Sequence, residues 1–258
     1  MSKESFRRAV AFAETTGLWR PEIEGEENLF LAAEQLKKGS VVAIANHPFK
    51  GDLIYPLVTC LRFLGGNIQH LIMPADQSQV DLLKTLKTFC HLVEQNRNGP
   101  WELLGNYFAF RIGAKLIDIE MIPVVKGVDV YYYGWKTARR SWENFLDRAG
   151  TALQESGTLI IIFPEGERSQ DGNLQSIKRG VIDLLERGGN NCLCLPLGVN
   201  LEGQRRGLNV RQKVVVQAGP LFGLGDLISE KPPRMNCQQK KEAARRLMED
   251  HLAPLISS

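Results

Sequence analysis

Short, almost wholly apolar runs alternate along the chain with longer stretches in which apolar residues recur every three or four positions. The runs VVAIAN (41–46) and TLIIIF (158–163) are the most apolar, which is typical of strands that are buried on both faces. Four further segments predict strands, at 67–73, 121–125, 193–199 and 213–218.

The clearest helix prediction covers 137–155, because apolar residues line one face of it and Gly157 ends it. Other helices are predicted at 53–64, 177–187 and 238–252, with broken helical structure over 76–118. Buried strands that alternate with amphipathic helices predict an α/β fold, with a largely parallel central sheet flanked by helices. Residues 1–40 predict a short helical N-terminal segment, which leaves 41–258 as the main domain.

Length, charge and cysteine content indicate what kind of domain this is and which partners it suits. The 258 residues, 43% of them hydrophobic, are enough for one large domain with a substantial core. A net charge of +3 suits an anionic substrate or membrane surface and is too small to indicate a nucleic-acid partner. The five cysteines are scattered without a C-x-x-C motif, so we expect no disulfide framework, no zinc site and a reducing cytoplasm. Cys192 and Cys194 lie in an apolar run and are better interpreted as buried packing than as metal ligands.

A histidine and an aspartate follow the first apolar run, in the segment NHPFKGD that holds His47 and Asp52. Because Asp52 falls where a helix begins, its carboxylate can accept a hydrogen bond from one imidazole nitrogen of His47. The other nitrogen is then free to take a proton. The simpler interpretation, that Asp52 caps the helix and His47 is an ordinary turn residue, fits the same spacing.

The second apolar run ends in FPEGERS (163–169), a Pro-x-Gly turn. Such a turn brings backbone N–H groups and the Arg168 guanidinium toward one sheet edge, where they can bind a phosphate. Lys178 and Gly180 then open a helix, another place that suits an anion. The alternatives are a solvated surface turn and a solvated basic face.

Motifs of several other enzyme classes are missing from the sequence. It has no G-x-S-x-G, no G-x-x-x-x-G-K-[ST], no G-x-G-x-x-G after a strand and no H-E-x-x-H. His70, His91 and His251 have no matching partners in the sequence, so we interpret them as structural or surface residues.

Together these segments resemble the glycerolipid acyltransferase family, which includes lysophosphatidic acid and glycerol-3-phosphate acyltransferases. NHPFKGD matches the family's first block, an Asn-His, four residues and an Asp. FPEGERS matches its third block, Phe-Pro-Glu-Gly-Thr-Arg-Ser, except at Glu167. A Lys-x-Gly, a strand with Pro196 and a Gly219-Pro220 pair follow in the family's order, and Lys126 stands where the second block has an arginine. The resemblance covers roughly residues 41–222.

The resemblance implies an acyltransferase domain over 41–258 and a role for each matched residue. His47 is the general base that deprotonates an acceptor hydroxyl, and Asp52 orients it. The donor is acyl-CoA or acyl-carrier protein, the acceptor is a phosphate-bearing lyso-glycerolipid such as 1-acylglycerol-3-phosphate, and no metal or cofactor takes part. The residues that hold the acceptor phosphate are Glu165, Gly166, Arg168, Lys178, Gly180 and Lys126.

Three alternatives remain open. The acceptor can be another lyso-lipid, such as a lyso-ornithine lipid. The same His-Asp pair can serve phosphoryl transfer or hydrolysis, although the chain lacks a nucleophile elbow. The protein can also be a catalytically silent lipid-binding module, which the intact His47, Asp52, Glu165 and Arg168 disfavour. The Tyr131-Tyr132-Tyr133 run and the Arg139-Arg140 pair match nothing in the family pattern.

The sequence predicts a cytoplasmic protein that contacts the membrane surface peripherally. No signal peptide is visible, and no apolar run approaches the ~20 residues that a membrane span needs. The stretch 6–12, followed by Trp19 and Arg20, mixes aromatic and basic residues and is a candidate contact with headgroups. The alternative is that these aromatic residues cover the core of the domain itself.

Overall fold

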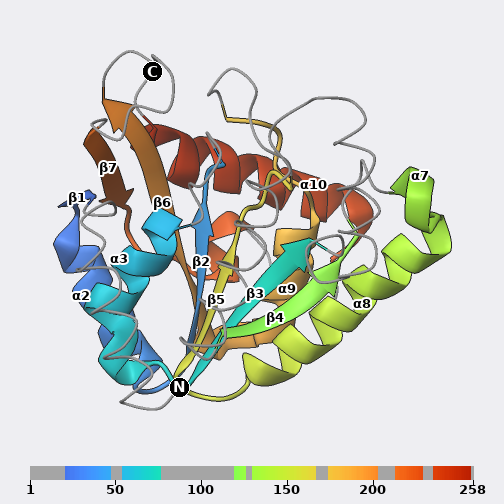
Figure 1. Cartoon of the computed structure of the whole chain (residues 1–258), viewed down its shortest axis with the longest axis horizontal. Coiled ribbons are helices and arrows are strands. Elements are labelled where there is room, and N and C mark those ends of the chain that lie inside the picture. The colour runs from blue at the N-terminus through green and yellow to red at the C-terminus, as the bar shows by residue number, and fades with distance from the viewer. Residues whose placement is uncertain are drawn as a thin grey trace, which may run out of the picture.

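The computed structural model describes residues 21–47, 54–76, 119–125, 130–166, 174–202, 213–228 and 235–256. Within these ranges the chain forms a seven-stranded sheet with the order β1-β7-β6-β2-β5-β3-β4 (Figure 1). The strands are β1 (Glu22–Glu24), β2 (Ser40–Ala45), β3 (His70–Asp76), β4 (Ile119–Val124), β5 (Thr158–Ile162), β6 (Cys192–Glu202) and β7 (Lys213–Ala218).

Neighbouring strands in this sheet pair in parallel, except β6 and β7, which pair antiparallel. The prediction of a largely parallel central sheet is therefore confirmed. β2 and β5 are adjacent near the middle of the sheet, with Ile44 opposite Ile162. Because parallel strands end at the same edge of a sheet, the segments that follow β2, β5, β3 and β4 all emerge at that edge.

Helices cover both faces of the sheet (Figure 1). One face packs against α2 (Glu26–Leu36) and α3 (Ile54–Leu64), and the other against α8 (Trp135–Ala152), α9 (Gly180–Gly188) and α10 (Cys237–Arg246). No helix in the described ranges combines the length and the apolar character needed to cross a membrane. Shorter elements are α7 (Val130–Tyr133), η1 (Gly65–Asn67), η3 (Gly189–Asn191), η4 (Leu224–Leu227), the π-helix η5 (Leu247–Leu252) and η6 (Ala253–Leu255).

β2 contributes to the hydrophobic cores on both faces, because successive side chains of a strand point to opposite sides. Val41, Ala43 and Ala45 pack with α2 and α3. Val42 and Ile44 pack with α8 and α9. Every residue of β2 and β5 is buried, which explains why neither segment alternates between polar and apolar residues.

The element boundaries differ from the predictions by a few residues. The predicted helix 137–155 is α8, which begins at Trp135, and the predicted helix 238–252 is α10 continued by η5. β1 was not predicted, because Glu22–Glu24 reads Glu-Ile-Glu and contains no apolar run. Residues 77–118, which include most of the predicted broken helices, lie outside the described residues.

Three cysteines, Cys60, Cys192 and Cys194, are buried and carry free thiols. Burial raises the pKa of Cys60 to about 12, and it raises the pKa of Cys192 to about 11 in spite of a hydrogen bond with Ser40. Apolar surroundings disfavour the thiolate. These side chains therefore pack as small apolar groups, as predicted for Cys192 and Cys194.

Replacing Phe145 by Ala tests the core beneath α8. Phe145 is fully buried, so its truncation should lower the free energy of unfolding by about 3–5 kcal/mol through lost burial and a residual cavity. Phe30→Ala is the matched control, because Phe30 is 57% exposed and its loss should cost less than about 1 kcal/mol. Urea denaturation measures both. Equal losses would contradict the assignment of Phe145 to the core.

Candidate active site

The end of β2 is held in place by the side chain of Asn46, the residue that follows the strand. Its amide Nδ2 donates to the Val199 carbonyl at 3.1 Å, and its Oδ1 accepts from the Val199 N–H at 2.6 Å. Asn46 is buried, and its side-chain amide takes the place of a peptide group against β6. The position of the next residue, His47, is thereby fixed relative to the sheet.

The end of β5 turns sharply through Phe163, Pro164, Glu165 and Gly166. The Gly166 N–H donates to the Phe163 carbonyl at 3.1 Å, and Gly166 has a φ of 74°, in the left-handed region that favours glycine. The Pro164 carbonyl accepts from the Lys178 N–H at 2.8 Å. This bond brings the segment before α9 against the turn.

Glu165 joins the two strand ends through its buried carboxylate. Its Oε1 accepts from the backbone N–H of His47 at 2.7 Å, and its Oε2 accepts from the backbone N–H of Gln175 at 2.7 Å. The residue is only 1% exposed. Hydrogen bonds to an ionised acceptor are roughly twice as strong as neutral ones, so this carboxylate holds three chain segments together.

The imidazole of His47 lies against the ring of Phe163. The ring centroids are 4.6 Å apart and the planes meet at 29°, a stacked arrangement. His47 is 8% exposed, so the ring sits in a largely enclosed position at the sheet edge. Stacking covers one face of the ring, so Phe163 does not cover the ring edge that carries the two nitrogens. Asp52 lies outside the described residues.

Lys178 and Gly180 occupy the approach to this edge. A Cβ built on Gly166 would lie 3.6 Å from the Cγ of Lys178, so the lysine side chain runs beside the turn. Gly180 begins α9 and is buried, and a Cβ there would lie 2.3 Å from Cζ2 of Trp142. Only glycine therefore permits this contact between α8 and α9.

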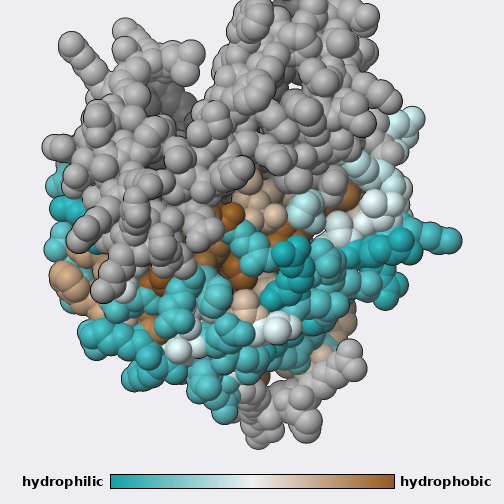
Figure 2. Space-filling view, turned by 60° about the horizontal axis from the view of Figure 1, so that its bottom comes forward, coloured by the Kyte–Doolittle hydropathy of each residue, from teal (hydrophilic) through white to brown (hydrophobic). Residues whose placement is uncertain are grey.

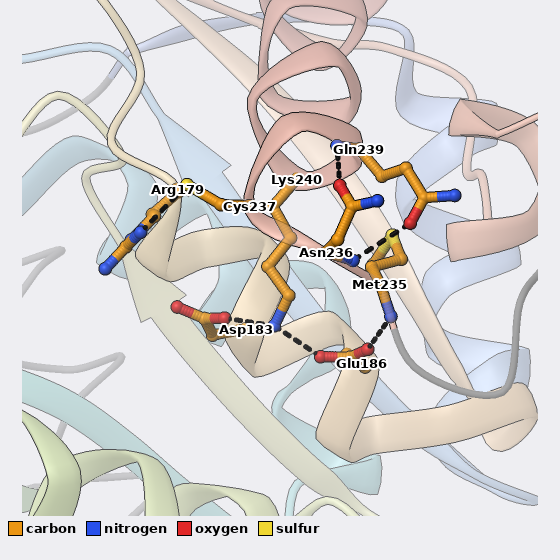
Figure 3. A network of polar contacts seen from close by, with 8 residues as sticks. All are labelled: Arg179, Asp183, Glu186, Met235, Asn236, Cys237, Gln239 and Lys240. Carbon is orange, nitrogen blue, oxygen red and sulfur yellow. Dashed lines mark hydrogen bonds and ion pairs between the residues drawn. The ribbon is translucent and has the colours of Figure 1, made fainter.

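Polar contacts between α9 and α10 support the segment that carries Lys178 (Figure 3). Lys240 of α10 lies 2.6 Å from both Asp183 and Glu186 of α9. Burial alone would lower the pKa of Lys240, but hydrogen bonds and charge from the two carboxylates outweigh it and raise the pKa. Arg179, next to Lys178, donates to the Cys237 Sγ at 3.2 Å, which ties the start of α9 to the start of α10.

The structure thus gathers five predicted site residues at one edge of the sheet: His47, Glu165, Gly166, Lys178 and Gly180. The predicted residues Asp52, Lys126 and Arg168 lie outside the described ranges. Among the residues that are described, no three His, Cys, Asp or Glu side chains gather in a group that could hold a metal ion. Sequence reasoning missed the contact of the Asn46 side chain with Val199, although an asparagine directly after an apolar run is a signal that can be recognised. It also missed the bond from the backbone N–H of Gln175 to Glu165, which no residue pattern signals.

Replacing Glu165 by Gln tests the bridge that its carboxylate forms between the backbone N–H groups of His47 and Gln175. Glutamine keeps one acceptor oxygen but turns an NH2 group toward a second backbone N–H, so the free energy of unfolding should fall by about 1–3 kcal/mol. Glu34→Gln is the matched control, because the Glu34 side chain is 65% exposed and its change should cost less than about 0.5 kcal/mol. Urea denaturation distinguishes the two. A Glu165→Gln protein as stable as the control would show that the bridge contributes nothing.

Comparison with known proteins identifies the family of the chain. Residues 20–200, more than half of the chain, match the family model described as Acyltransferase. A search of curated proteins gave no match. Among solved structures, the chain is similar to the 1-acyl-sn-glycerophosphate (LPA) acyltransferase PlsC from Thermotoga maritima. That match has 14% identity and a TM-score of 0.48, and it covers 95% of this chain and 77% of the other. The chain belongs to the Acyltransferase family, and the protein is an acyltransferase.

Proposed function

We propose that the protein moves a fatty acyl group from acyl-CoA or acyl-carrier protein to a hydroxyl of a phosphate-bearing glycerolipid such as 1-acylglycerol-3-phosphate. The observation that carries the proposal is the hydrogen bond between Glu165 and the backbone of His47. It joins two motif segments whose bonded residues are 118 positions apart in the chain. A histidine base and a phosphate-binding turn are then neighbours, as transfer to a phosphorylated alcohol requires.

His47 acts as the general base in this proposal. Its imidazole removes the proton of the acceptor hydroxyl while the oxygen attacks the thioester carbonyl. The new C–O ester bond forms, the C–S bond breaks, and the thiolate leaves with the proton returned by the imidazolium. Asp52 accepts a hydrogen bond from the other ring nitrogen and stabilises the imidazolium. General base catalysis of this kind typically supplies ~10²–10⁴-fold, and positioning supplies the remainder.

The acceptor phosphate is bound in this proposal by Arg168, Lys178 and Lys126. Arg168 offers a bidentate fork, whereas Lys178 and Lys126 offer point charges. The side chain of Lys178 runs beside Gly166, which supports placing the phosphate near this turn. The two glycines contribute by leaving room, Gly166 for the lysine and phosphate and Gly180 for the packing of α9 on Trp142.

Glu165 is assigned a positioning role in place of the direct phosphate contact that the family resemblance suggested. Both of its oxygens already accept backbone hydrogen bonds, and a carboxylate next to a phosphate would repel it. Glu165 therefore acts through the backbone of His47 and through Gln175. An acyl-transfer assay that crosses the two donors with a panel of lyso-lipid acceptors, including a lyso-ornithine lipid, tests the substrate assignment.

His47→Ala should lower turnover at least ~10³-fold while the protein remains folded, because it removes the base and leaves the sheet intact. Asp52→Asn should lose activity to a similar or smaller extent through the wrong imidazole tautomer. The matched control is His70→Ala, because the His70 side chain is 49% exposed and pairs with Glu155 on the surface. Steady-state kinetics and circular dichroism provide the readouts. Wild-type turnover by a folded His47→Ala protein would exclude the mechanism.

Arg168→Lys should mainly raise the KM for the phosphorylated acceptor, because lysine keeps the charge but loses the bidentate fork. Arg148→Lys is the matched control, since Arg148 pairs with Glu120 on the surface. Initial rates measured against each substrate in turn separate the two KM values. An unchanged acceptor KM with a raised donor KM would reassign Arg168 to the donor.

A further inference from the structure

α7 and the first turns of α8 expose large aromatic side chains. Tyr131 is 91% exposed and Trp135 is 70% exposed, more than any other large hydrophobic residue in the described ranges. Hydrophilic residues cover most of the described surface on the face that Figure 2 shows, which is usual for a protein surface in water. Tyr131 and Trp135 are four positions apart, and they are more exposed than Phe30 and Leu31 of α2, the other exposed pair of large hydrophobic residues in the described ranges.

Trp135 continues the apolar stripe of α8 beyond the core. Ala138 and Trp142 stand three and seven positions after it, so the three side chains lie on one side of the helix. Ala138 is buried and Trp142 is half-buried against Gly180 and Phe145, whereas Trp135 remains exposed. The apolar stripe of α8 therefore extends beyond the part of the helix that packs on the core, and Trp135 is its exposed end.

Cations surround this end of the helix. Lys136, Arg139 and Arg140 are all exposed, and they outnumber the carboxylate of Glu143, which pairs with Arg139 at 2.8 Å. Lys136 and Arg140 are four positions apart and occupy one side of α8. We call Tyr131, Trp135 and these three cations the aromatic tip. Its composition, aromatic side chains beside several positive charges, complements an anionic lipid surface.

The aromatic tip lies at the same edge of the sheet as His47. β4 runs parallel to β3 and ends at Val124, and the next residue, Val125, donates its N–H to Ser141 Oγ of α8 at 3.0 Å. Figure 1 shows α7 and the start of α8 beyond the ends of β3 and β4. Trp142 also packs on Gly180, two residues after Lys178. A surface that touched the aromatic tip would therefore face the edge of the sheet at which His47 lies.

We propose that the aromatic tip docks the protein on bilayers that contain anionic phospholipids. Tyr131 and Trp135 enter the headgroup region, where tryptophan and tyrosine are enriched in membrane proteins, and the cations bind lipid phosphates. The purpose of docking rests on the proposed function, because a lyso-glycerolipid acceptor resides in a membrane. An acidic protein, such as an acyl-carrier protein, would also pair with the cations, and it is the alternative that the experiment below tests.

Vesicle cosedimentation of the full-length protein tests the proposal, with phosphatidylcholine vesicles compared with an equimolar mixture of phosphatidylcholine and phosphatidylglycerol. Tyr131→Ser combined with Trp135→Ser should weaken binding to the mixed vesicles at least ~10-fold, since affinity scales with the apolar area that enters the interface. Lys136→Gln combined with Arg140→Gln should weaken binding to the mixed vesicles about 10-fold or more and change binding to phosphatidylcholine little. The control is Phe30→Ser combined with Leu31→Ser, two residues of α2 that are 57% and 59% exposed.

Two outcomes would overturn the proposal. The first is equal binding by the wild type and the Tyr131→Ser/Trp135→Ser protein, or equal losses in that protein and in the α2 control. The second is a Tyr131→Ser/Trp135→Ser protein that binds vesicles like the wild type but no longer transfers acyl groups from acyl-carrier protein. That result would make the aromatic tip a docking surface for the carrier protein.

A short-chain lyso-glycerolipid acceptor that stays monomeric in water separates this proposal from the proposed function. The Tyr131→Ser/Trp135→Ser protein should transfer acyl groups to it at the wild-type rate, because neither residue belongs to the site. A wild type inactive on every acceptor, with vesicle binding that still depends on the aromatic tip, would reject the proposed function and support docking. A wild type that is active on an acceptor, with vesicle binding that does not depend on the aromatic tip, would support the proposed function and reject docking through the aromatic tip.

Discussion

The buried carboxylate of Glu165 is the constraint on which the arrangement of the site depends. An ionised group that is 1% exposed loses nearly all of its hydration, and that loss is offset only if hydrogen bonds replace the water. Two backbone N–H groups supply those bonds, from His47 and from Gln175. The chain segments after β2 and before α9 thus meet at the end of β5, because displacing either segment would remove a backbone N–H from the carboxylate.

The sheet makes this meeting possible because its middle is rigid. β2 and β5 are adjacent, and every residue of both strands is buried between helical layers. Their carboxyl ends therefore have little freedom, and Asn46 restricts β2 further by bonding to Val199 of β6. A histidine placed directly after such a strand has a defined position before any substrate arrives, which is the preorganisation that the proposed role of His47 as general base needs.

The segment that carries Lys178 is supported from outside the sheet. α9 is fixed to α10 by the contacts of Lys240 with Asp183 and Glu186, and to α8 by the contact of Gly180 with Trp142. Lys178, just before α9, is thereby aimed along the turn at Gly166. α8 consequently has two parts, a middle that packs on α9 and a start that presents Trp135 to the outside.

The sequence by itself determined which segments are strands and which are helices. Strands buried on both faces appear as continuous apolar runs, whereas amphipathic helices have apolar residues every three or four positions. It also predicted that His47 and Glu165 follow buried strands, since each motif comes directly after an apolar run. It did not reveal β1, whose Glu-Ile-Glu sequence becomes a strand only by pairing with β7. Nor did it reveal the role of Glu165, whose partners are backbone N–H groups. Every residue except proline has such a group, so no residue pattern records the bond, and only the tertiary structure decided which segments the carboxylate would join.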